Sequence, residues 1–160
     1  MFHIILLCAA LGYISAQSDS SHIAASLVAV PEAVKTDQQI GAWVEVMKTM
    51  RDTSSAEEKR VEKIKQLLLK AFPRWPPNYA ENLVEAADNE WKLVNSGSSK
   101  LKEVYNKSYD LKSDAKLYKM SPDQRRAEGE KLYNSLSDDD KKKLEEIWKA
   151  GVERHQQRQG

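Results

Sequence analysis

Two helix starts, at Ser121 and Ser137, constrain the fold of this chain more than any other feature of the sequence. The Ser121 side chain can accept a hydrogen bond from a backbone N–H of the first helical turn, and Gln124 completes a capping box. Pro122 suits the first turn, where its missing N–H is not needed. Ser137 precedes three aspartates, whose negative charge is favourable at a helix N-terminus. The sequence therefore predicts two consecutive helices, beginning at Pro122 and Asp138.

Apolar residues recur at helical spacing in both segments. In the second they fall at i, i+3, i+4 and i+8, on one face of a helix: Leu144, Ile147, Trp148 and Val152. The first ends in the apolar group Leu132, Tyr133 and Leu136. Because almost no loop separates the two helices, we expect them to pack as an antiparallel hairpin. Short helices are marginal alone in water, so the rest of the chain must cover their apolar faces.

Further helical patterns precede this pair. Helices are predicted over residues 37–51, 57–72, 79–94 and 98–118, with caps at Thr36, at Ser54 and Ser55, and at Asn78. The last of them carries an apolar seam formed by Leu101, Val104, Ser108, Leu111, Ala115 and Tyr118. No strand pattern stands out. We expect an all-α fold, a single domain of five or six amphipathic helices packed as hairpins and without disulfides.

Residues 1–16 have the character of a secretory signal peptide rather than of structure. An apolar run over residues 4–11 is followed by the small residues Ser15 and Ala16 and then by polar residues, which predicts cleavage after Ala16. The run is too short to span a membrane. The one cysteine, Cys8, lies in this segment, so the exported chain would have no disulfide. We therefore expect a secreted, extracellular protein without a membrane span.

The remaining chain divides into a flexible leader over 17–35, a helical domain over 36–152 and a polar tail over 153–160. Lys and Arg number 25 and Asp and Glu 24, and this balance gives no reason to expect nucleic acid as a partner. After removal of the signal peptide the histidines are His22 and His155, each near a terminus. A histidine-based catalytic site has no rigid position there, so we expect no enzymatic activity.

Three segments of the last helical pair resemble the SXP/RAL family of secreted nematode proteins: KMSPDQ from Lys119, EKLYNSLS from Glu130 and KKLEEI from Lys142. The capped helix that starts TDQQIGAW at Thr36 is similar to an earlier part of that domain. The resemblance covers about residues 36–151. It implies a helical, EF-hand-like, cation-binding protein that is secreted, antigenic and allergen-like, with a host protein as a partner.

Carboxylates are the candidates for the implied calcium or magnesium. They are the run Asp138, Asp139 and Asp140, and the pair Asp110 and Asp114 one turn apart. A twelve-residue calcium loop read from Asp110 would place Lys112 at its third position and would lack glycine at its sixth. The alternative is that the aspartate run only caps a helix.

Aromatic and methionine side chains offer a second kind of site. The segment from Phe72 to Tyr79 holds three prolines and three aromatics, so Trp75 lies on a stiff loop. With Trp43 and Met47 these residues could line a pocket for a small apolar ligand, as in a helical carrier of fatty acid or retinoid. Alternatively, Trp75 contacts a partner protein, or all five side chains fill the core.

Overall fold

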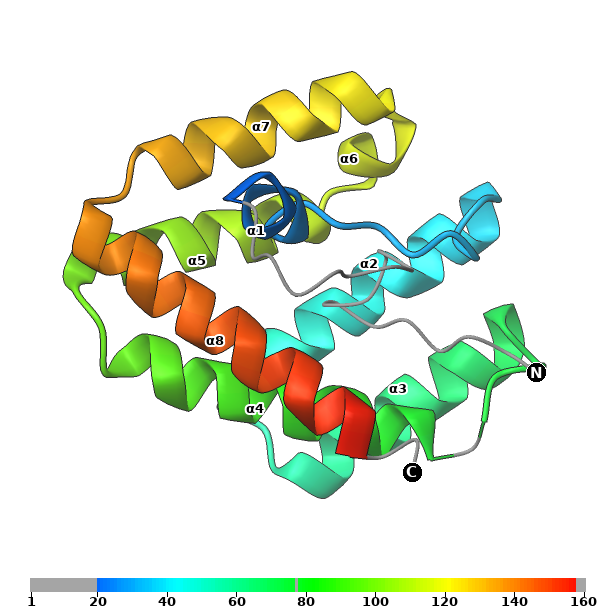
Figure 1. The fold of residues 1–160 in the computed structure, drawn as a ribbon. Helices are drawn as coiled ribbons and strands as arrows, with labels where there is room; N and C mark the ends of the chain where they lie inside the picture. The colour runs from blue at the N-terminus through cyan, green and yellow to red at the C-terminus, as the bar shows by residue number, and fades with distance from the viewer. Residues whose placement is uncertain (1–19, 77, 158–160) are drawn as a thin grey trace.

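The structure is a computed structural model that describes residues 20–76 and 78–157, the side chains of 155–157 excepted. The predicted signal peptide lies outside these residues. Within them the chain forms a small, single, all-helical domain without strands (Figure 1). Its eight helices are α1 (Ser20–Ser26), α2 (Asp37–Arg51), α3 (Glu57–Ala71), α4 (Tyr79–Asn95), α5 (Ser99–Lys112), α6 (Ala115–Lys119), α7 (Pro122–Asn134) and α8 (Asp138–Gln157). The all-α prediction is confirmed.

Three of the predicted caps are confirmed. The Thr36 hydroxyl accepts a hydrogen bond from the Gln39 amide, and Ser121 accepts one from the Gln124 amide, each within a complete capping box. At α8 the Ser137 hydroxyl accepts from the Asp140 amide at 3.2 Å. These caps pair N–H groups that otherwise have no partner in the helix.

Two other predicted caps are wrong. Helix α3 follows Ala56, which makes no capping bond, while the Ser54 and Ser55 hydroxyls donate to the Asp52 carboxylate instead. Asn78 precedes α4 but its side chain makes no capping bond. Serine and asparagine bond nearby groups in turns as readily as helix amides, so their presence does not fix which they choose.

The predicted helix over residues 98–118 is interrupted. Helix α5 ends at Lys112, and Asp114 caps the short α6 by accepting from the Lys116 amide at 2.9 Å. The chain turns there, which leaves Ala115 exposed and buries Leu117. The Tyr118 hydroxyl donates to the Lys112 carbonyl at 2.7 Å and so pairs one acceptor at the end of α5.

Consecutive helices pack together in α2–α3 and α3–α4, but the last two helices differ from the expected hairpin. Helix α7 packs mainly against α1, whereas α8 crosses over α4 and also contacts α5 and α1 (Figure 1). The turn between them therefore joins two helices whose main partners differ, although both also contact α5.

The segment predicted as a flexible leader contains α1. Ile23, Ala24, Leu27 and Val28 are buried in it, and the Ser108 hydroxyl of α5 donates to the Leu27 carbonyl. Gly129 of α7 lies directly against the Ala24 carbonyl group. At the other end, α8 continues to Gln157, into the predicted polar tail.

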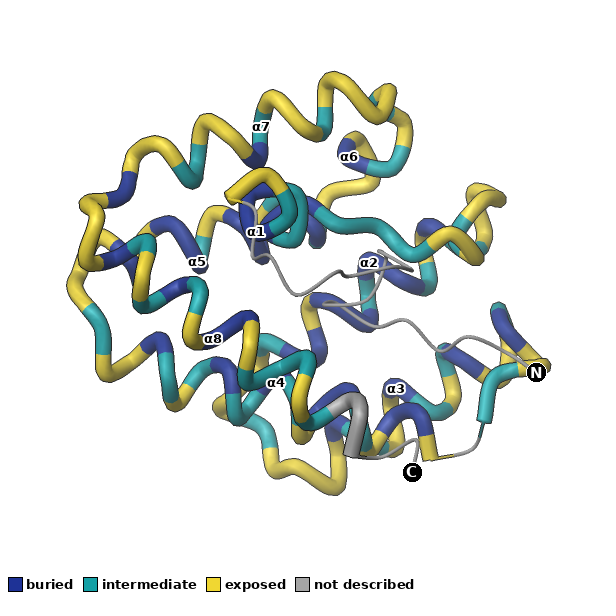
Figure 2. Tube along the Cα trace, in the orientation of Figure 1, coloured by how far each residue is buried: buried dark blue, intermediate teal, exposed yellow. Residues whose placement is uncertain are grey.

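Buried residues form one core between the helices, and exposed residues lie on their outer faces (Figure 2). Among the residues with described side chains, six polar or charged ones are also buried: Thr49, Arg60, Glu90, Ser108, Lys112 and Asp140. Arg60 is paired, since its guanidinium donates to both oxygens of Asp88 at 2.9 and 2.6 Å and to the Met50 carbonyl at 3.2 Å. Glu90 and Lys112 instead line a small cavity between the helices.

Candidate functional site, a polar cavity between four helical segments

Helices α4, α5 and α8, together with the end of α1, enclose part of a small polar cavity. Its volume is about 30 Å³. Its lining residues are Ser26, Leu27, Glu90, Tyr105, Ser108, Lys112, Leu144, Ile147 and Trp148. The space suffices for one or two water-sized groups and is far too small for an acyl chain.

Glu90 on α4 supplies a carboxyl group to the cavity. Its side chain is buried and accepts a hydrogen bond from the Tyr105 hydroxyl of α5. Burial raises the pKa of Glu90, while the Tyr105 bond and the positive charges of Lys112 and Arg154 act in the opposite direction. The proton-bound form of this carboxyl is thus favoured relative to an exposed glutamate.

Lys112, at the C-terminal end of α5, brings a cation into the same space. It is buried, and its ammonium lies 5.6 Å from the centre of the Tyr109 ring. The aromatic face and the carbonyl end of the helix dipole both favour a positive charge at this place. Arg154 of α8 adds a second positive charge near Glu90.

Trp148 on α8 completes the lining. The residue is 7% exposed, and its indole N–H is buried with no hydrogen-bond partner among the described residues. Ser108 differs, because its hydroxyl is already bonded to the Leu27 carbonyl. A buried donor without a partner is costly in a folded protein, so the Trp148 side chain is an unusual feature of the residues around this cavity.

The predicted metal ligands are placed differently. Asp140 is buried as part of the Ser137 cap, and Asp138 lies 3.8 Å from Lys141. Asp110 forms an ion pair with Arg51, and Asp114 caps α6. The described part of the chain has no group of three or more His, Cys, Asp or Glu side chains that could hold a metal ion.

The predicted apolar site residues are brought together as an aromatic cluster. The Trp75 ring stacks on Phe72 with centroids 4.2 Å apart, and it meets Trp43 and Tyr79 edge-on at 5.6 and 4.6 Å. Met47 is buried in the same core. Trp75 is half-buried, so the proline-rich loop packs one face of its tryptophan onto the bundle.

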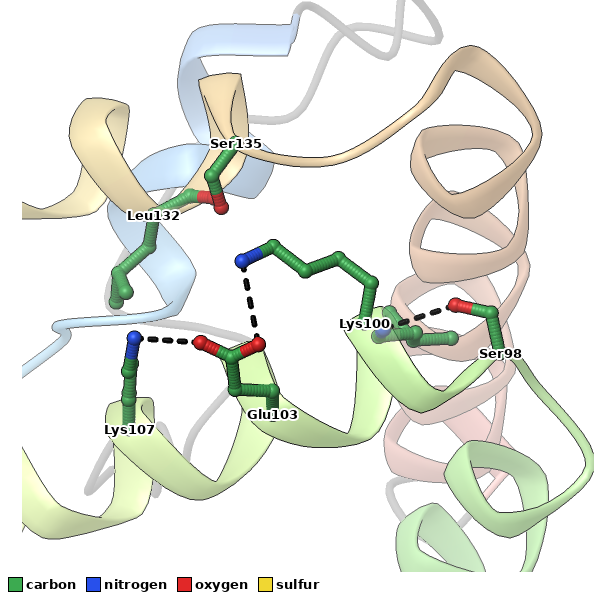
Figure 3. Close-up of polar contacts among 7 residues, drawn as sticks. Ser98, Lys100, Glu103, Lys107, Leu132 and Ser135 are labelled. Atoms are coloured by element: carbon green, nitrogen blue, oxygen red, sulfur yellow. Dashed lines mark hydrogen bonds and ion pairs between the residues drawn. The ribbon is translucent and has the colours of Figure 1, made fainter.

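A further polar network lies on the surface of α5. The Glu103 carboxylate accepts from Lys100 at 3.2 Å and from Lys107 at 2.6 Å, in the turns that follow the Ser98 cap (Figure 3). These hydrogen bonds lower the pKa of Glu103. All three side chains are exposed, which is typical of a solvated helix face rather than of a site.

Sequence reasoning placed Ser108, Leu144, Ile147 and Trp148 on apolar helix faces but missed the charged cavity residues Glu90 and Lys112, although a signal for both was present. Glu90 lies at i+3 from Ala87 and four residues before Val94, within the apolar stripe of its helix. Lys112 lies four residues after Ser108, in continuation of the predicted seam. A charged residue at an apolar register is the pattern that could have drawn attention to both.

None of the helices within residues 20–76 and 78–157 is both long enough and apolar enough to cross a membrane. Comparison with models of protein families, with curated protein sequences and with solved structures finds no match to this chain. The resemblance to the SXP/RAL family therefore stays a prediction.

Proposed function

We propose that this chain is a secreted, non-enzymatic binding protein whose ligand site is the polar cavity between α1, α4, α5 and α8. The observation that carries the proposal is that Trp148, whose buried indole N–H has no partner among the described residues, lines the same cavity as Glu90 and Lys112. Three helices and the end of α1 thus contribute polar and apolar side chains to one small space.

Binding is favoured over catalysis because the side chains of the cavity that could react already make hydrogen bonds within the protein. The Ser108 hydroxyl donates to a backbone carbonyl, so no base is placed to remove its proton. One oxygen of the Glu90 carboxyl already accepts a hydrogen bond from the Tyr105 hydroxyl. These groups are held in fixed positions, which suits recognition of a small polar ligand.

The experiment is a ligand screen against the ¹⁵N-labelled chain lacking residues 1–16, read from the indole N–H signals of its tryptophans. The Trp148 signal is assigned by its loss in Trp148→Phe. Trp43 serves as an internal reference, because it is buried in the aromatic cluster away from the cavity lining. We expect small polar compounds to shift the Trp148 signal saturably and to leave Trp43 unchanged. If no compound moves Trp148 alone, the cavity is not a ligand site.

Secretion is tested separately, by the intact mass of the protein exported from eukaryotic cells. Cleavage after Ala16 predicts a chain that begins at Gln17. The divalent-cation hypothesis also stays a prediction, and calorimetric titration with calcium and magnesium tests it. A flat heat trace at millimolar ion would remove that hypothesis and leave the cavity proposal intact.

A further inference from the structure

The middle of α5 carries the acceptor sequence for N-linked glycosylation, Asn106, Lys107 and Ser108. No other asparagine of the printed sequence has serine or threonine two residues after it. Asn106 is half-buried, and its carboxamide oxygen accepts a hydrogen bond from Arg51 of α2 at 2.9 Å. A glycan is joined to the carboxamide nitrogen and leaves the oxygen able to accept that bond. The contact between α2 and α5 is therefore compatible with a modified Asn106.

An open cleft between the end of α2 and α5 provides room beside Asn106. Its volume is about 410 Å³, and its lining residues are Lys48, Arg51, Asp52, Asp110 and Ser113. Arg51 links the cleft to the acceptor, because it donates to both the Asp110 carboxylate and the Asn106 carboxamide. Asp110 lies one helical turn after Asn106, so the two residues share a face of α5. The volume is in the range of small-ligand sites and suffices for a sugar ring.

We infer that Asn106 is an N-glycosylation site, with this cleft as the space that the first sugar of its glycan requires. The inference rests on the secretion part of the proposed function, since the glycan is added on entry into the secretory pathway, and it does not depend on the polar cavity. It adds a modification site on another part of the molecule.

The transfer is a substitution at the first carbon of the sugar. The Asn106 carboxamide nitrogen attacks C1 of an oligosaccharide that is linked to a polyprenyl diphosphate. A carbon–nitrogen bond forms, and the bond from C1 to the diphosphate oxygen breaks. The lipid diphosphate leaves with the electron pair of that bond, and the nitrogen loses one proton.

Ser108 determines when the transfer can occur. In the folded chain it is 1% exposed and its hydroxyl donates to the Leu27 carbonyl, so this hydroxyl cannot take part in recognition of the acceptor. Residues two apart in an α-helix do not share a face, so Asn106 and Ser108 also point in different directions. The glycan must therefore be added before α5 packs against α1. The bond from Ser108 to Leu27 joins residues 81 positions apart, and such distant contacts form slowly, which leaves the acceptor open in the nascent chain.

The test is the intact mass of the full chain exported from eukaryotic cells, measured before and after treatment with peptide N-glycosidase. We expect a mass above that of the polypeptide, which the enzyme removes while it converts Asn106 to aspartate. Asn106→Gln should abolish the added mass. Asn134→Gln is the matched control, because Asn134 is also a helical asparagine but has leucine two residues after it. This variant should keep the glycan.

The space at the cleft is tested by comparing the glycoprotein with the unmodified chain lacking residues 1–16, made in bacteria. We expect the same helical circular dichroism and the same midpoint of urea unfolding, because a sugar at the cleft displaces no packed side chain. A lower midpoint for the glycoprotein would contradict the assignment of this space.

The remaining outcomes separate the inference from the proposed function. An exported chain with the mass of the polypeptide alone would overturn the inference and leave secretion standing. An added mass that persists in Asn106→Gln would belong to another modification and would also overturn it. A chain that is not exported would overturn both secretion and the glycan, and the ligand screen would still decide on the polar cavity.

Discussion

Substitution of Gly129 by alanine tests whether α1 is docked on α7 as the structure shows. A Cβ atom at this position would overlap the Ala24 carbonyl oxygen and come within 3.0 Å of a Val28 methyl group. The oxygen belongs to the backbone, so α1 as a whole would have to move. Overpacking of this kind costs about 1–3 kcal/mol. Alanine in a helix interior is favoured over glycine by about 1 kcal/mol, which offsets part of that cost.

Gly41→Ala is the matched control, because Gly41 also lies inside a helix but has no atom within 4 Å of the added Cβ. It should stabilise the protein by about 1 kcal/mol. We expect Gly129→Ala to be about 1–3 kcal/mol less stable than this control. Urea unfolding followed by circular dichroism measures both variants. Equal stabilisation by the two substitutions would refute the reasoning and would mean that α1 does not lie against Gly129.

Three further predictions concern paired or buried groups. Asp88→Ala should lower the free energy of unfolding by about 3 kcal/mol in urea titration, because it leaves the buried Arg60 guanidinium without its carboxylate; a loss of a few tenths would contradict this. Ser121→Ala should lower the free energy of unfolding by about 1 kcal/mol and Ser55→Ala by less, because of these two serines only Ser121 caps a helix. Equal losses would contradict the assignment of Ser121 as a cap. Burial raises the pKa of Glu90, so its contribution to stability is present below its ordinary pKa of 4.5 and falls as pH rises through the higher folded-state pKa. Glu90→Gln should remove that fall from unfolding curves measured between pH 4.5 and 8, and parallel curves for the two proteins would contradict it.

Much of the helical content could be predicted from local signals. The caps at Thr36 and Ser121 pair a side chain with a backbone amide three residues away, so nothing beyond the local sequence is needed. The stripe through Leu144, Ile147 and Trp148 is buried as its spacing predicts. Where two local partners compete for one side chain, as at Ser55, the sequence does not decide between them. In the structure the Ser55 hydroxyl donates to the Asp52 carboxylate and does not cap the helix.

The partners of each helix could not be predicted, because an apolar face shows that a helix is covered but not by what. Helix α7 carries only a weak apolar stripe, and α1 can pack closely against it because Gly129 has no side chain. A short segment such as Ser20–Ser26 has few helical turns, so its sequence pattern is weak. Its helical form depends on the surfaces that bury Ile23 and Leu27.

The cavity could not be predicted for a related reason. Trp148 was expected in the core, and it is buried there, but whether its indole N–H finds an acceptor depends on α4, α5 and α1 together. Lys112 and Glu90 each break an apolar register, yet their proximity follows only from the way α4 and α5 pack. The site is thus a property of tertiary contacts rather than of any single segment.

The bond from Ser108 to Leu27 joins residues 81 positions apart and has a consequence for synthesis. The ribosome releases the chain from its N-terminus, so α1 emerges long before α5 and α7, the helices that cover it. Until then its apolar residues have no native partner in the nascent protein. Formation of such distant contacts is slow, so α1 should be among the last parts to become ordered and the part most in need of a chaperone.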